Sequence, residues 1–199
     1  MATHDFSKSL NYEQSKFPVQ DKFYTERLGA TVISRADFDD DEGRALQRMD
    51  VDVQFIYKGE RINVSEKNRK QDYGDLLLEF YSMFPDTPGW MNNSNADYLA
   101  YFVPGKVYWI NKRELEEFYH NVLEPVIPDN YFAQLVKDYP QKSARFNRTI
   151  LVNGRAERVT VVQAYNHPYN SSKEWYTENI CVSFACLKRA GVCIEEYKL

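Results

Sequence analysis

The chain has 199 residues, of which 43% are hydrophobic and 27% charged, and this predicts one globular domain with a sizeable core. Its net charge of −4 argues against a surface coated in positive charge, so a nucleic-acid contact would need a local basic patch. The three cysteines lack paired C-x-x-C spacing, which argues against a disulfide framework or a zinc site and favours reduced thiols in a cytosolic protein.

The first part of the chain predicts a leader, a helix and three strands. Residues 1–16 are a polar leader, and Pro18 stands at the start of a short amphipathic helix that stops at Gly29. The acidic run of residues 37–42 is typical of a solvated loop or of the start of a helix, and we expect the loop. Strands are then predicted over residues 50–57, 61–67 and 73–79.

The remaining segments alternate between helix and strand. Ser94 is a good N-cap for a short helix over residues 97–102. The Asn153-Gly154 pair predicts a β-hairpin with a return strand over residues 158–163. The other predicted elements are a strand at 106–110, helices at 112–123 and 130–139, and a last strand at 180–186.

This order predicts an α+β or α/β fold with a mixed central β-sheet flanked by helices. We expect residues 17–147 to form its core and residues 148–199 to be a β-rich C-terminal extension of the same domain.

The alternation of side chains sets the register of the first two strands. Successive residues of a strand point to opposite faces, so burying both apolar sets together requires Val53 opposite Val64 and Phe55 opposite Ile62. This register leaves Lys58-Gly59 as a two-residue turn.

The polar face of this hairpin then collects acids and a lysine. Asp50 lies across from Lys67, and Asp52 lies across from Ser65 and diagonal to Lys67. Glu66 falls on the apolar face unless a bulge or the end of the strand turns it. On the third strand, Glu79 interrupts an apolar run, and a buried carboxylate needs a partner or a metal.

The sequence has an acid at the start of one strand and a lysine one hairpin later, within this order of elements. This pattern resembles that of the PD-(D/E)XK nuclease-like superfamily. The resemblance covers residues 19–110, and Gln47 and Gly89-Trp90 resemble features of small phage and bacterial members. It implies a restriction-endonuclease-like core and a metal-dependent nuclease that hydrolyses DNA with Mg²⁺ or Mn²⁺.

The resemblance also implies roles for individual residues. Asp52, Glu79 and Glu66 would bind the metal, Lys67 would assist the attacking water, and the early-helix acid would be Glu26. The chain departs from the family pattern at Ser65, where an acid is usual. Contacts with the substrate are expected from Arg61, Arg69, Lys70 and Trp90.

Other interpretations remain open at this point. Asp50, Asp52 and Lys67 could be an ordinary cross-strand charge pairing without a function. The chain could also be an inactive nuclease-fold protein that binds or assembles, such as a phage component or an inhibitor. We expect an intracellular protein without a membrane partner, since no apolar stretch approaches spanning length. A homodimer and an RNA substrate are further alternatives.

Overall fold

The computed structural model describes residues 15–36, 41–167 and 172–199, and it is an α+β fold with two sheets, one of them mixed. The predicted fold class is therefore confirmed. The chain divides into two compact units. The first unit comprises Met1–Asp72, Ser94–Ile110 and Glu195–Leu199, and the second comprises Tyr73–Asn93 and Asn111–Ile194. Most of the predicted leader (residues 1–14) and of the predicted acidic loop (residues 37–40) lie outside the described residues.

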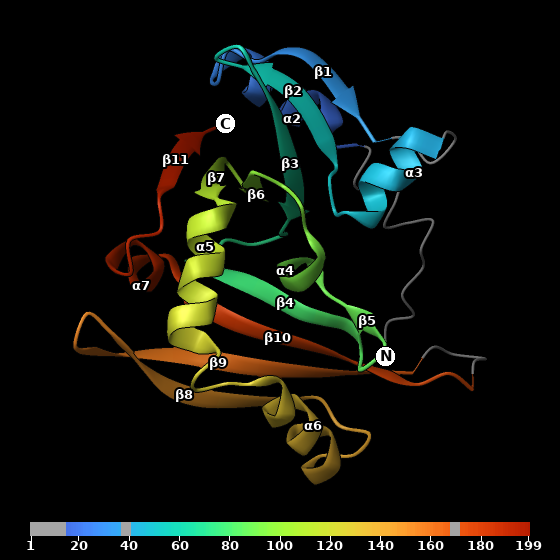
Figure 1. Ribbon diagram of the computed structural model, residues 1–199, viewed down its shortest axis with the longest axis vertical. Coiled ribbons are helices and arrows are strands. Elements are labelled where there is room, and N and C mark those ends of the chain that lie inside the picture. The colour runs from blue at the N-terminus through green and yellow to red at the C-terminus, as the bar shows by residue number, and fades with distance from the viewer. Residues whose placement is uncertain (1–14, 37–40, 168–171) are drawn as a thin grey trace. The chain divides into compact units, whose positions relative to one another are not determined.

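The first unit contains a six-stranded sheet with the order β1-β2-β3-β6-β7-β11 (Figure 1). Strands β1 and β2 and strands β2 and β3 pair antiparallel, whereas β3 and β6 pair parallel. Its elements are α2 (Phe17–Glu26), β1 (Thr31–Arg35), α3 (Asp41–Arg48), β2 (Val53–Tyr57), β3 (Glu60–Asn68), β6 (Tyr98–Val103), β7 (Lys106–Asn111) and β11 (Ile194–Lys198).

Helix α2 covers one face of this sheet with aromatic side chains. Tyr24 lies with its ring centroid 4.9 Å from that of Phe55, and Phe23 lies 5.9 Å from Phe102 in an edge-on arrangement. Both α2 rings are buried, and Val53 and Val64 of the hairpin belong to the same core. Aromatic rings bury much apolar area each, so these contacts are the main attachment of α2 to the sheet.

The β2–β3 hairpin has the predicted register. Val53 pairs with Val64 and Phe55 with Ile62, so the apolar residues of both strands share the buried face. The turn residues Lys58 and Gly59 have φ values of 52° and 86°. Two consecutive positive φ values are typical of the turn that matches the twist of a two-residue hairpin.

The second unit contains a five-stranded antiparallel sheet with the order β5-β4-β10-β9-β8 (Figure 1). The hairpin of β8 and β9 turns at Asn153 and Gly154, as predicted. Its strands are β4 (Asp75–Phe84), β5 (Thr87–Pro88), β8 (Ala144–Val152), β9 (Arg155–Asn166) and β10 (Trp175–Ser183), and its helices are α4 (Trp90–Asn93), α5 (Lys112–Phe118), η1 (Tyr119–Leu123), α6 (Asp129–Asp138) and α7 (Phe184–Arg189).

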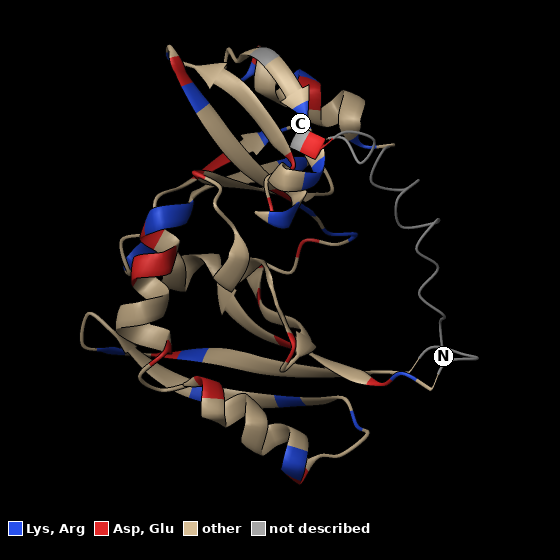
Figure 2. Cartoon of the chain, turned by 45° about the vertical axis from the view of Figure 1, so that its right-hand side comes forward, with Lys and Arg blue, Asp and Glu red and all other residues tan. Residues whose placement is uncertain are grey.

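Helices α5 and α6 confirm the two helices predicted before the β8–β9 hairpin. Asn111 caps α5 by accepting a hydrogen bond from the Glu114 N–H at 3.1 Å. Helix α5 begins with basic residues and continues with acidic ones (Figure 2), and Lys112 forms an ion pair with Glu116. The core face of the sheet meets both helices, because the ring of Phe80 lies 4.8 Å from Tyr119 of η1 and 5.7 Å from Phe132 of α6.

Three predictions about elements were wrong. Residues 98–103 form strand β6 rather than a helix, since this run is buried from Leu99 onward between β3 and β7. Asp41 begins helix α3, where a loop was predicted. The strand predicted at 180–186 ends at Ser183, whose side chain caps α7.

The third predicted strand does not join the hairpin. Strand β3 has β6 as its second neighbour, whereas β4 pairs with β5 and β10 in the other sheet. The unit boundaries, which fall at Asp72 and Ser94 among other places, therefore differ from the predicted division of the chain at residue 147. A strand cannot be assigned to a sheet from its own pattern, because its partners come from distant segments.

Candidate functional site

Two carboxylates and one ammonium meet where β2 begins and β3 ends. Lys67 Nζ lies 2.6 Å from Asp50 Oδ1 and 3.9 Å from Asp52 Oδ2. The Ser65 hydroxyl donates to the other oxygen of Asp50 at 2.5 Å. We call Asp50, Asp52 and Lys67 the acid–lysine cluster. The alternation of the hairpin predicted this grouping, although Ser65 reaches Asp50 rather than Asp52.

The backbone places Asp50 beside Lys67. Asp50 has a φ of 51°, a left-handed conformation between helix α3 and strand β2. Asp and Asn adopt this conformation more readily than most side chains do. The turn is fixed because the Asp50 N–H donates to Gln47 O at 3.0 Å and the Asp52 N–H donates to Val64 O at 2.9 Å.

Asp52 is held by the main chain of the facing strand. The Glu66 N–H donates to Asp52 Oδ2 at 2.6 Å. Burial raises the pKa of Asp52, the Asp50 carboxylate adds to this effect, and Lys67 opposes it. A nearby cation stabilises the ionised form of such a carboxylate, and a metal ligand must be ionised.

Glu66 points to the opposite face of β3, where other partners hold it. Arg35 Nη1 donates to Glu66 Oε2 at 2.7 Å, and the Tyr24 hydroxyl donates to Oε1 at 2.6 Å. Arg35 also donates to Asp21 Oδ1 at 2.7 Å. The side chain of Glu66 is 5% exposed, and burial raises its pKa while Arg35 and Tyr24 oppose this.

We expected the carboxylate of Glu66 near Asp52, but its main-chain N–H lies there instead. Its carboxylate, predicted as a metal ligand, is occupied by Arg35 and Tyr24, and its main-chain N–H reaches Asp52. The predicted alternative, that Glu66 falls on the apolar face of the hairpin, describes its position. Glu66 therefore contacts the cluster through its main chain and not through its carboxylate.

Glu79 lies on β4, in the second unit. It is half-buried and lies on the face opposite to the buried side chains of Leu78 and Phe80, so it is not the buried carboxylate that the apolar run suggested. Its close neighbour is Gly89, where an added Cβ would lie 2.4 Å from the Glu79 carbonyl oxygen. The metal role of Glu79 stays a prediction.

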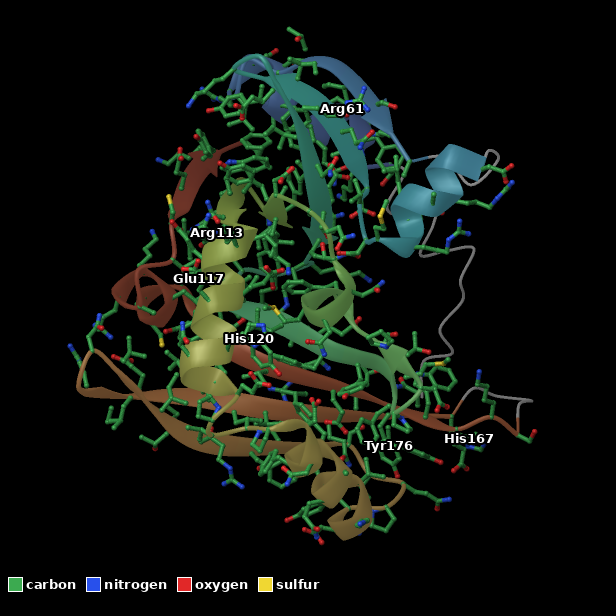
Figure 3. All side chains as sticks on the ribbon, in the orientation of Figure 1. Arg61, Arg113, Glu117, His120, His167 and Tyr176 are labelled. Atoms are coloured by element: carbon green, nitrogen blue, oxygen red, sulfur yellow. The ribbon has the colours of Figure 1, made fainter. Side chains whose placement is uncertain are left out.

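The residues expected to contact a substrate differ in position. Arg61 is exposed on the hairpin (Figure 3), on the face that also carries Lys67. Arg69 and Lys70 follow directly after β3, where the Arg69 N–H donates to Phe102 O at 2.8 Å. Trp90 is only 8% exposed and belongs to the second unit, so the expectation that it offers a stacking surface is wrong.

Helix α2 places a different acid from the predicted one beside the Arg35–Glu66 pair. Glu26 is exposed and lies 3.9 Å from Lys22 on the same helix. Asp21 and Tyr24, one helical turn apart, contact the Arg35–Glu66 pair instead. The helical spacing of these two residues could have suggested a shared face, but Arg35 lies on a strand that the sequence pattern did not predict. Gln47, the other expected accompaniment, donates to Ala36 O at 3.4 Å.

The donors of the acid–lysine cluster suit a hard cation with water ligands. Asp50 and Asp52 supply carboxylate oxygens, and Mg²⁺ is commonly bound by one or two carboxylates together with several waters. Within residues 15–36, 41–167 and 172–199, no group of three or more His, Cys, Asp or Glu side chains could hold a metal ion. A cation here would therefore rest on two acids.

No family model, curated protein or solved structure matches this chain. Across the part of the chain that the structure describes, none of the helices has the length and apolar character needed to cross a membrane.

Proposed function

We propose that the acid–lysine cluster is the centre of a nuclease that requires Mg²⁺ or Mn²⁺ and hydrolyses phosphodiester bonds of DNA. The observation that carries this proposal is the approach of Lys67 Nζ to within 2.6 Å of Asp50 and 3.9 Å of Asp52. Two acids and a lysine on one strand face combine the oxygen ligands of a hard cation with a positive charge for a phosphate.

Each side chain has a distinct task in this proposal. Asp50 and Asp52 would hold the cation. A bound cation would lower the pKa of its water and neutralise charge on the phosphate. Lys67 would stabilise the negative charge that develops on the phosphate oxygens. The Glu66 N–H keeps Asp52 oriented, and exposed Arg61 offers a contact to the substrate backbone on the same strand face.

Hydrolysis of a labelled DNA oligonucleotide in the presence of Mg²⁺ tests this function. We expect D52N and K67M to lower the rate by roughly 10²-fold or more, because each removes charge that acts on the reacting phosphate. The matched control is K22M, which removes a lysine whose partner is exposed Glu26 on α2. Full activity in both purified, folded cluster variants would rule the proposal out.

A second candidate is a nuclease-fold protein that binds or assembles without catalysis. The observation that favours it is Ser65, which stands where the family pattern has an acid and uses its hydroxyl to hold Asp50. In this case the chain would bind DNA or a protein partner with no hydrolysis in Mg²⁺ or Mn²⁺. Hydrolysis of the labelled oligonucleotide by the wild-type chain separates the two candidates, since only the nuclease predicts it.

A further inference from the structure

A buried glutamate of the second unit lies outside the acid–lysine cluster and has no hydrogen-bond partner among the described residues. Glu178, on β10, is 0% exposed, and neither of its carboxylate oxygens accepts a hydrogen bond from a described residue. It shares a strand face with Ile180 and Val182, which are also fully buried. An ionised carboxylate without partners in such a place costs several kcal/mol, so a proton or a cation is expected there.

The residue paired with Glu178 across the sheet, Gln163, presents an acceptor to it. Gln163 pairs directly with Glu178 across the sheet and is also 0% exposed. Its Nε2 donates to Tyr139 O at 3.2 Å and to Lys142 O at 2.9 Å, which fixes the orientation of the amide. Gln163 Oε1 is therefore left facing inward without a donor. A neutral carboxylic acid has the O–H that this oxygen needs.

The charged and titratable groups around Glu178 come from three other elements. On β4 the cross-strand neighbour is Tyr81, whose hydroxyl interacts with Asp129 of α6. From α6 comes Tyr131, with a buried hydroxyl, and Arg148 of β8 lies 4.7 Å from the Tyr131 ring centroid. Among the described residues, no Lys, Arg or His forms an ion pair with Glu178.

We propose that Glu178 is a protonated acid in the folded protein at neutral pH, that it donates to Gln163 Oε1, and that its ionisation loosens the sheet beneath α6. Burial raises the pKa of Glu178 to about 8, against an ordinary value of 4.5. The folded chain then holds one more proton than the unfolded chain between these two values, so stability falls as the pH rises through this window. Below pH 4.5 both states hold the proton, and the full contribution is present.

The same oxygens could instead accept a cation, which would keep Glu178 ionised at neutral pH. The two alternatives predict opposite protonation states of one carboxyl group. They also differ in whether a chelator changes the stability of the chain.

A carbon-13 NMR titration of the full chain, labelled at the glutamate carboxyl carbons, tests the proposal. We expect one resonance with the chemical shift of a protonated acid at pH 6.5 that titrates with a midpoint near pH 8. This resonance should be absent in E178Q, whose amide can donate to Gln163 in the same way, and present in the control E174Q, which changes an exposed glutamate near the start of β10. A Glu178 resonance that is ionised at pH 6 would overturn the proposal.

Thermal unfolding of the wild-type chain gives a second readout that needs no variant. With a chelator present throughout, we expect the melting temperature to fall from pH 6 to about pH 8 and to level off above it. A flat profile, or a melting temperature at pH 6 that falls when the chelator is added, would exclude a proton as the partner of Glu178 and favour a cation.

Discussion

Glu66 and Glu178 are both buried glutamates on the inward face of a strand, yet the two units treat them differently. Glu66 accepts hydrogen bonds from Arg35 and Tyr24, at 2.7 Å and 2.6 Å. Neither carboxylate oxygen of Glu178 accepts a hydrogen bond from a described residue. Arg35 supplies a countercharge to the first carboxylate, whereas the second is the one that we propose to be protonated.

The difference lies in the partners of the two carboxylates. Glu66 has a cation and a hydroxyl beside it, and Glu178 lies in an apolar core. In the first unit, Glu66 reaches the acid–lysine cluster through its main-chain N–H, which donates to Asp52. In the second unit, Glu178 makes the fold sensitive to pH. Burial raises the pKa of both glutamates, and a countercharge opposes this only at Glu66.

The largest expected effect comes from removing the countercharge of Glu66. R35M leaves a buried carboxylate without its cation, and we expect it to lower the free energy of unfolding by about 3–5 kcal/mol. Urea denaturation measures this change. R44M is the matched control, because Arg44 pairs with fully exposed Asp41 and such pairs contribute about 0–1 kcal/mol. Equal losses in both variants would show that the Arg35–Glu66 pair behaves as a surface pair.

The second effect is the pH dependence that Glu178 confers. Because its folded pKa of about 8 lies above 4.5, the free energy of unfolding should fall as the pH rises, by on the order of 1 kcal/mol per pH unit. Urea denaturation at several pH values measures the slope. E178Q should flatten it, and an unchanged slope in this variant would assign the pH dependence to another group.

The smallest effect compares the two tyrosines nearest the two glutamates. Y24F removes a hydrogen bond to a charged acceptor, and we expect a loss of about 1–2 kcal/mol in the free energy of unfolding. Y131F removes a hydroxyl that interacts with the exposed side chain of Arg148, and it should lower the free energy of unfolding by less than Y24F does. A larger loss in Y131F than in Y24F would reverse the comparison between the two sites.

Local patterns predicted the hairpin and its polar face. The alternation of Val53 and Phe55 with polar residues, and the Lys58-Gly59 turn, were enough to fix the pairing, because a slip by one residue would expose the entire apolar set. Asp52 and Lys67 came together for the same reason. The α+β class was also predictable from the order of periodic segments.

Contacts between distant segments were out of reach of these patterns. Arg35 and Glu66 are 31 positions apart, and the sequence pattern of strand β1 does not indicate that Arg35 pairs with Glu66. Residues 98–103 form an apolar run without alternation, which fits a central strand or a buried helix equally well. Glu178 escaped notice because polar residues at the start of β10 hide the strand pattern there.

Calorimetric titration of Mn²⁺ into the wild-type chain and three variants tests the central claim, that Asp50 and Asp52 form the metal site. We predict one site that is weakened at least tenfold in D50N and in D52N. The site should be retained in E66Q, because the Glu66 carboxylate is occupied by Arg35 and Tyr24. Binding that is unchanged in D52N, or lost only in E66Q, would contradict this assignment.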